Sequence, residues 1–153
     1  MSNDRGLYPN HGDYSQLEKL LKEGRWEEAD YETYLVMLSI VDRREGDWIR
    51  PDEMKGFPSA ALREIDRLWT QYSQGKFGFS IQKQIYETVR NSCQNFDRRA
   101  QIESSHQSDL FSNESVEFVK RVGWQVERYK DLIFDLDRSP IGHLPGCWAF
   151  RVF

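Results

Sequence analysis

Residues 25–44, RWEEADYETYLVMLSIVDRR, carry the clearest structural signal in this chain. One set of side chains recurs every three or four positions, as on one face of an α-helix: Trp26, Ala29, Thr33, Met37 and Ile40. Leu35, Leu38 and Val41 add apolar side chains on the remaining faces. Because a surface helix keeps a polar face, we expect this helix, which is apolar nearly all round, to lie at the centre of a helical domain.

Shorter helices are expected on both sides of the central one. A helix beginning at Asp13 and stopping at Gly24 has the cap and stop residues that helices favour. Downstream, helical spacing predicts one helix from Pro58 to Gly75, another from Ser80, and a short one after Ser112.

The remaining segments lack this spacing. Residues 45–57 predict a loop with one helical turn, and residues 94–110 predict a long loop or a loosely held helix. Leu132, Phe134 and Leu136 alternate with polar residues, which indicates a short strand or an extended segment. The prediction is a mainly α, single-domain helical bundle over residues 13–153, after a flexible leader over residues 1–12.

Length, charge and cysteine content exclude several classes of protein. The 153 residues contain no apolar run near the roughly 20 residues of a membrane span, and the polar start is not a secretory signal. A net charge of −4 does not indicate the basic surface with which proteins bind nucleic acids. We therefore expect a protein of the cytoplasm or plastid stroma, with at most peripheral membrane contact. Cys93 and Cys147 are isolated from each other, so both are expected to be reduced and structural.

No catalytic motif is present. The chain lacks a nucleophile elbow, a zinc-protease helix and a phosphate-binding loop. His11, His106 and His143 are scattered, and His143 in a turn is expected to be a structural group in preference to a haem ligand. We expect neither catalysis nor a bound metal, so the 14% of aromatic residues become the main functional signal.

Four strings of residues carry a family resemblance. They are RWEEADYET (25–33), IDRLWTQYSQGKFGFSIQKQIY (65–86), RVGW (121–124) and DLIFDLDRSPIGHLP (131–145). In order and spacing, over roughly residues 14–145, they resemble the genomes-uncoupled-four family. Members of that family are tetrapyrrole-binding regulators of magnesium chelatase.

This resemblance implies a fold, a ligand and a partner. The implied fold is a helical bundle with a cupped apolar cavity flanked by two mobile loops, of which one matches residues 43–57 and the other lies around Trp124 and the C-terminal side. The implied ligands are protoporphyrin IX, Mg-protoporphyrin IX and, in some relatives, linear bilins. The implied partner is the large porphyrin-binding subunit of magnesium chelatase. By position, the residues that line the cavity are Leu68, Phe79, Ile81 and Trp124.

Physical chemistry adds further candidates to this site. A porphyrin needs an apolar wall for its ring, which Trp48, Phe57, Phe77, Phe79, Trp124 and Trp148 can supply. It also needs cations at the rim for its two propionates, which Arg121, Arg128, Arg138 and Arg151 can supply. The ligand-binding residues are thus predicted to be Trp48, Phe57, Leu68, Phe77, Phe79, Ile81, Arg121, Trp124, Trp148 and Arg151.

Two departures from the family pattern leave an alternative open. Residues 57–62 read FPSAAL where relatives have a Pro-Cys pair and an acidic residue, and the chain stops soon after the GHLP string at 142–145. The alternative is a protein–protein regulatory module that has lost or changed its tetrapyrrole ligand.

Overall fold

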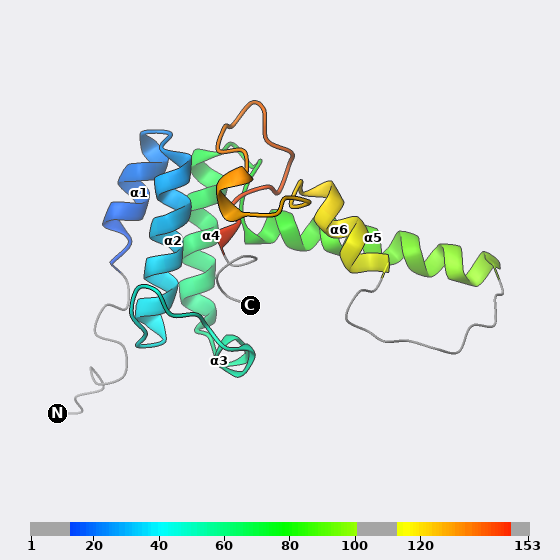
Figure 1. Ribbon diagram of the computed structural model, residues 1–153, viewed down its shortest axis with the longest axis horizontal. Helices are drawn as coiled ribbons and strands as arrows, with labels where there is room; N and C mark the ends of the chain where they lie inside the picture. The colour runs from blue at the N-terminus through cyan, green and yellow to red at the C-terminus, as the bar shows by residue number, and fades with distance from the viewer. Residues whose placement is uncertain (1–12, 101–112, 148–153) are drawn as a thin grey trace.

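The computed structural model describes residues 13–100 and 113–147, and it is helical, as predicted (Figure 1). The helices are α1 (Ser15–Lys22), α2 (Trp26–Ile40), α3 (Pro51–Lys55), α4 (Ser59–Tyr72), α5 (Phe79–Ala100) and α6 (Asn113–Arg121), followed by a 3-10 turn at Tyr129–Asp131. Within these residues, no helix combines the length and hydrophobicity that a membrane span requires. The predicted leader at 1–12 lies outside the described residues.

In two segments, residues 94–110 and 132–136, the structure decides between alternatives that the sequence left open. The alternative of a helix in residues 94–110 is confirmed up to Ala100, and residues 101–110 lie outside the described residues. Of the two alternatives for residues 132–136, the strand does not form, because the backbone there pairs with side chains and not with a neighbouring strand, while Leu132 has the extended backbone of the other alternative. The Ile133 N–H donates to His143 Nε2 at 2.9 Å, and the Ser139 hydroxyl donates to the Ile133 carbonyl at 2.6 Å. The segment is therefore irregular.

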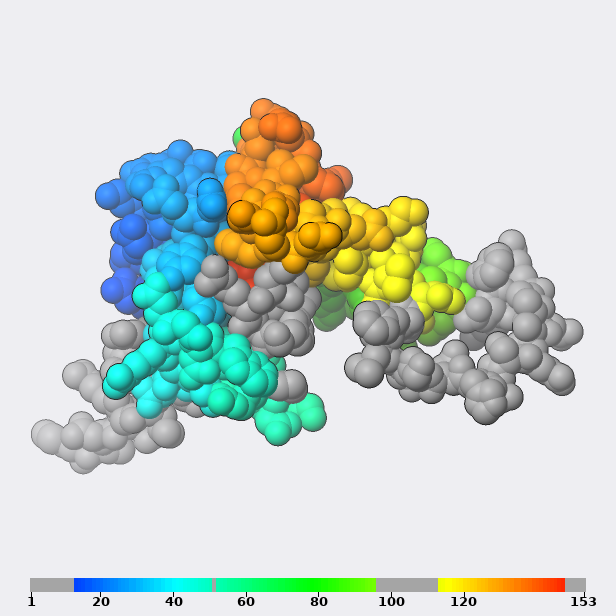
Figure 2. Space-filling model, viewed as in Figure 1, coloured from blue at the N-terminus to red at the C-terminus, as the bar shows by residue number. Residues whose placement is uncertain are grey.

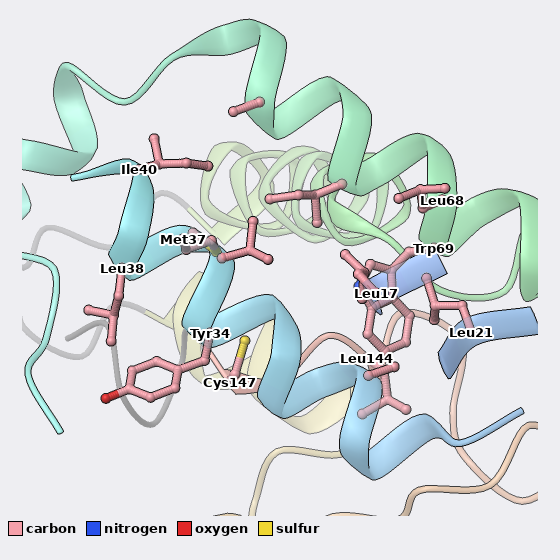
Figure 3. Close-up of a cluster of buried hydrophobic side chains, with 14 of the residues drawn as sticks. Leu17, Leu21, Tyr34, Met37, Leu38, Ile40, Leu68, Trp69, Leu144 and Cys147 are labelled. Atoms are coloured by element: carbon pink, nitrogen blue, oxygen red, sulfur yellow. The ribbon is translucent and has the colours of Figure 1, made fainter. Parts of the chain in front are cut away.

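The main hydrophobic core lies between α1, α2 and α4, which run side by side (Figure 1). As expected, α2 is at its centre: eight of its 15 residues are buried. In Figure 3, Leu17 of α1 and Leu144 of the C-terminal segment lie close to Trp69 of α4. The Trp69 indole N–H donates to the Thr33 hydroxyl at 2.9 Å. The nitrogen, which is the only polar atom of this buried ring, therefore has a hydrogen-bond partner.

A second, smaller core holds α5 and α6 together. It consists of the buried residues Phe118, Val122, Trp124 and Leu132. In Figure 2, α6 covers part of the long α5, and residues 125–140 fill the space between α6 and the first two helices. Tyr129 and Phe134 pack against both cores, so this segment joins the two halves of the molecule.

The turn between α4 and α5 interlocks with the C-terminal segment. The Gly78 N–H donates to the Leu144 carbonyl at 3.0 Å, and the Gly142 N–H donates to the Lys76 carbonyl at 2.9 Å. Gly78 has a φ of +133°, and a Cβ there would lie 2.7 Å from both Asp66 Oδ1 and Thr70 Cγ2. Only glycine fits this turn, which directs Phe77 into the core and starts α5 at the next residue.

A buried carboxylate, Asp30 of α2, ties the C-terminal segment to the core. It accepts the Gly146 N–H at 2.6 Å and the Tyr129 hydroxyl at 2.9 Å, and it is fully buried. Burial raises the pKa of Asp30 to about 6, against the opposing effect of these hydrogen bonds. Between pH 3.8 and about 6 the folded state thus binds more protons than the unfolded state, so the stabilisation from Asp30 is complete at low pH and is lost as pH rises through about 6.

Replacing Asp30 by Asn should remove this pH dependence. The difference in unfolding free energy between the natural chain and the D30N variant should fall by roughly 1 kcal/mol from pH 5 to pH 7.5, measured by urea unfolding. Subtracting the variant cancels the titration of every other group. The matched control is D52N, at a carboxylate that is 97% exposed, which should change the unfolding free energy at pH 7.5 by less than about 0.5 kcal/mol. A difference between the natural chain and D30N that stays the same from pH 5 to pH 7.5 would show that Asp30 does not titrate in this way.

Candidate functional site

A cavity of about 610 Å³ lies at the seam between the two hydrophobic cores. This volume falls within the ~300–1,000 Å³ range of protein sites for small molecules and cofactors. α2, α3, α4, α5 and α6 all contribute to the wall. The lining residues are Met37, Met54, Leu62, Phe79, Gln82, Lys83, Tyr86, Ser115, Phe118, Val119 and Trp124.

Helical spacing explains how α5 and α6 form one wall together. Residues 79, 82, 83 and 86 of α5 follow the i, i+3, i+4, i+7 pattern of a single helix face. Residues 115, 118 and 119 of α6 follow the first part of the same pattern. Each helix thus presents one continuous strip of side chains to the cavity.

The cavity has a closed end and an open end. Met37 and Trp124 are 1% and 5% exposed, so protein covers the wall near them. Tyr86, by contrast, is 37% exposed, and Lys83 is also exposed. A ligand therefore has an apolar interior and a solvent-facing edge along α5.

Aromatic rings with fixed orientations form one side of the cavity. Phe118 packs edge-to-face against Trp124 and against Tyr86, with ring centroids 5.6 Å apart in both pairs. The Trp124 indole N–H donates to the His143 carbonyl at 2.7 Å, which fixes the indole plane. Flat aromatic surfaces held in this way suit a flat conjugated ligand.

Gln82 belongs to the wall, yet its amide is used for structure. The amide nitrogen donates to the Gly142 carbonyl at 3.0 Å and to the Pro145 carbonyl at 2.9 Å. Gln82 is 3% exposed, so these bonds satisfy groups that water does not reach. Gln82 therefore anchors this part of the cavity wall to the C-terminal segment.

His143 has the structural role that the sequence predicts. Its Nδ1 lies 2.6 Å from the Val122 carbonyl and its Nε2 accepts the Ile133 N–H, so the ring is neutral with the proton on Nδ1. Burial lowers the pKa of His143 below its ordinary value, which favours the neutral ring. Both ring nitrogens are thus occupied. The described part of the chain holds no cluster of three or more His, Cys, Asp or Glu that could bind a metal.

Two of the predicted site residues line the cavity. Phe79 stands at the start of α5, and Trp124 follows α6, on opposite sides of the seam. Their contact with a ligand stays a prediction, but the structure brings them to one cavity.

The structure places other predicted wall residues elsewhere. Phe57, Leu68 and Phe77 are buried in the main core, where they do not reach the cavity surface. Ile81 is partly exposed on α5 and is not part of the wall. Trp48 is 43% exposed, with the Arg50 guanidinium 5.1 Å from its ring centroid.

Of the predicted arginines, Arg121, Arg128 and Arg138 do not line the cavity. Arg121 pairs with Glu117 at 3.2 Å and borders a separate, smaller hollow of about 490 Å³ with Gln84, Ile85, Thr88 and Ile141. Arg128 pairs with Asp131 at 3.0 Å. Trp148 and Arg151 lie outside the described residues.

Several lining residues are absent from the sequence prediction. Gln82, Tyr86 and Val119 lie on the same helix faces as Phe79 and Phe118, so helical spacing could have found them once one wall residue was known. Met37 and Leu62 gave no such signal, because a buried apolar residue in a helix is equally compatible with a solid core.

Comparison with known proteins supports the family resemblance. The GUN4-like family model matches residues 9–153. The tetrapyrrole-binding protein of Arabidopsis thaliana chloroplasts is 24% identical over 140 residues, which cover 90% of this chain and 49% of that protein. The uncharacterized protein ycf53 of Porphyra purpurea is 28% identical over 145 residues, 91% of this chain and 52% of that protein. The chain spans about half the length of these curated relatives.

Solved structures share the fold. Ligand-free GUN4 from Arabidopsis thaliana superposes with a TM-score of 0.61 at 25% identity, covering 86% of this chain and 80% of that one. GUN4 from Chlamydomonas reinhardtii gives a TM-score of 0.62 at 26% identity, covering 89% and 81%.

Fold and site together define a small helical domain with an apolar, aromatic-walled cavity between two cores. Since the family model matches almost the whole sequence, the chain belongs to the GUN4-like family. The resemblance carried by the four sequence strings is thereby confirmed.

Replacing Gln82 by Met should destabilise the fold, because two buried carbonyls lose their donor. We expect a loss of about 2–4 kcal/mol in unfolding free energy, measured by urea unfolding. The matched variant is Q84M, at an exposed glutamine two residues along the same helix, which should change stability by less than about 0.5 kcal/mol. Equal losses in both variants would show that the Gln82 amide does not anchor the C-terminal segment.

Proposed function

We propose that this chain binds a porphyrin-type tetrapyrrole in the cavity at the seam and regulates magnesium chelatase without transforming the pigment. The observation that carries the proposal is the cavity itself, which combines an apolar interior with an open edge in a family that includes a named tetrapyrrole-binding protein. Protoporphyrin IX and Mg-protoporphyrin IX are the proposed ligands, and a linear bilin is a further candidate.

The size and chemistry of the wall favour a flat hydrophobic pigment. Covering roughly 300 Å² of ring surface at about 25 cal/mol per Å² contributes on the order of 7 kcal/mol before entropic costs. Once the entropic costs are subtracted, the remaining free energy of binding corresponds to reversible binding. Reversible binding suits a protein that delivers its ligand. Phe118 and Trp124 offer ring faces and edges at fixed angles, so they can cover a macrocycle without reordering.

The composition of the wall supports binding over catalysis. Among the described residues that line the cavity, none is a His, Cys, Asp or Glu, so the wall offers no Ser-His or Cys-His pair and no carboxylate pair of the kind that activates a nucleophile or transfers protons in hydrolases. The mechanism we propose is shielding followed by delivery: the cavity excludes water from the ring and releases the pigment to the large porphyrin-binding subunit of magnesium chelatase. The site of action would be the cytoplasm or the plastid stroma, with at most peripheral membrane contact.

Replacing Val119 by Glu should weaken pigment binding. Val119 lines the cavity from α6, and a carboxylate there would lose hydration against an apolar ring and repel the acidic arms of the pigment. We expect the dissociation constant for protoporphyrin IX to rise by about tenfold or more, measured by titrating the Soret absorption band.

The matched control is V116E, one turn earlier on the same helix, where the valine is 48% exposed and does not line the cavity. This variant should bind as the natural chain does. If the two variants lose affinity equally, or if the natural chain shows no saturable change at tens of micromolar pigment, the proposed site is wrong.

Adding the protein to magnesium chelatase should lower the protoporphyrin concentration that gives half-maximal activity. The V119E variant should lose this effect, because delivery needs a loaded cavity, whereas V116E should keep it. The measurement is the rate of Mg-protoporphyrin formation across a range of porphyrin concentrations. Stimulation that V119E retains in full would instead favour a protein–protein regulator that no longer uses a tetrapyrrole.

A further inference from the structure

The cavity wall carries a single charged side chain. Among the described lining residues, Lys83 alone is ionic; the others are apolar, aromatic, amide or hydroxyl groups. An isolated charge in an otherwise apolar wall is costly unless solvent or a ligand compensates it, so its position calls for a physical reason.

Lys83 stands at the open edge of the cavity. It lies one helical turn after Phe79 on α5 and is exposed, whereas Met37 and Trp124 at the sealed side are buried. A lysine in such a position can rest its methylene stem along the apolar wall while its ammonium group stays in water. The side chain thus reaches the boundary between the hydrophobic interior and solvent.

Lys83 takes part in none of the ion pairs formed among the described residues. Nearby arginines differ in this respect: Arg121 is paired with Glu117 and Arg128 with Asp131. Those two guanidiniums also belong to other parts of the surface. Among the described lining residues, the cavity therefore faces one cation, and that cation forms no ion pair with another described residue.

We propose that Lys83 recognises the acidic group of the ligand, so that the cavity selects flat hydrophobic pigments with a free carboxylate and orients that carboxylate toward α5. This inference rests on the proposed function and adds the polarity of the bound pigment to it. The apolar edge of the ring enters toward Met37, Met54 and Leu62, and a propionate forms a charge-assisted pair with the Lys83 ammonium group.

The test compares an acid with its ester on three variants. Protoporphyrin IX and its dimethyl ester, in the same dilute detergent buffer, are titrated against the natural chain and against K83Q, K83R and K120Q. Lys120 is an exposed lysine of α6 that does not line the cavity, so K120Q removes the same charge from the molecule.

We expect K83Q to weaken binding of the acid about five- to tenfold and to leave binding of the ester unchanged. K83R should keep the preference for the acid, since it keeps the cation, and K120Q should match the natural chain. Raising the ionic strength should narrow the gap between acid and ester in the natural chain and leave the K83Q variant unaffected.

Two results would overturn the inference in distinguishable ways. If K83Q weakens the acid and the ester equally, or weakens neither, pigment binding stands but Lys83 does not select the carboxylate. If the natural chain binds neither compound, the proposed function fails and the inference falls with it.

Discussion

The buried carboxylate of Asp30 is the constraint on which the arrangement of the whole domain depends. A carboxylate without water must find hydrogen-bond donors, and the central helix finds them in Gly146 and Tyr129, 116 and 99 residues further along the chain. Holding these two groups brings the C-terminal segment and residues 125–140 onto the face of α2. The pKa of Asp30, raised to about 6 by burial, reflects the cost of that arrangement.

This arrangement leaves a boundary, the seam, between the two hydrophobic cores. The C-terminal segment packs Leu144 and Cys147 into the main core, while Trp124 and Leu132 build the second core against α6. Gln82 and Trp124 then bond to the same segment from two sides, at the Gly142, Pro145 and His143 carbonyls. The cavity lies where the two cores meet, and two of its wall residues, Gln82 and Trp124, are held by hydrogen bonds to the C-terminal segment.

Sequence patterns predict much of this fold. The spacing in residues 25–44 locates α2 and its central position, and cap and stop residues locate α1 and α4 to within a few positions. The motif SQGKFGFSIQKQIY indicates the family, and the structure gives a physical reason for part of that motif: Gly78 permits the turn, and Gln82 anchors the C-terminal segment. Near Leu132 the sequence left a strand and an extended segment open, because alternation of apolar residues cannot tell a strand from a segment without strand pairing that packs against two cores.

By itself, the sequence determined the helices, the helical class and the family, because these depend on local spacing and on short motifs. The tertiary structure decided which aromatic residues face a cavity. Phe77 and Phe79 are separated by one glycine, yet the turn at Gly78 sends the first into the core and the second to the cavity wall. Likewise, pairing with Glu117 and the direction of α6 keep Arg121 away from the wall, while Lys83 reaches it. Whether a side chain packs into a core or borders a hollow depends on where distant segments meet, and no local pattern contains that information.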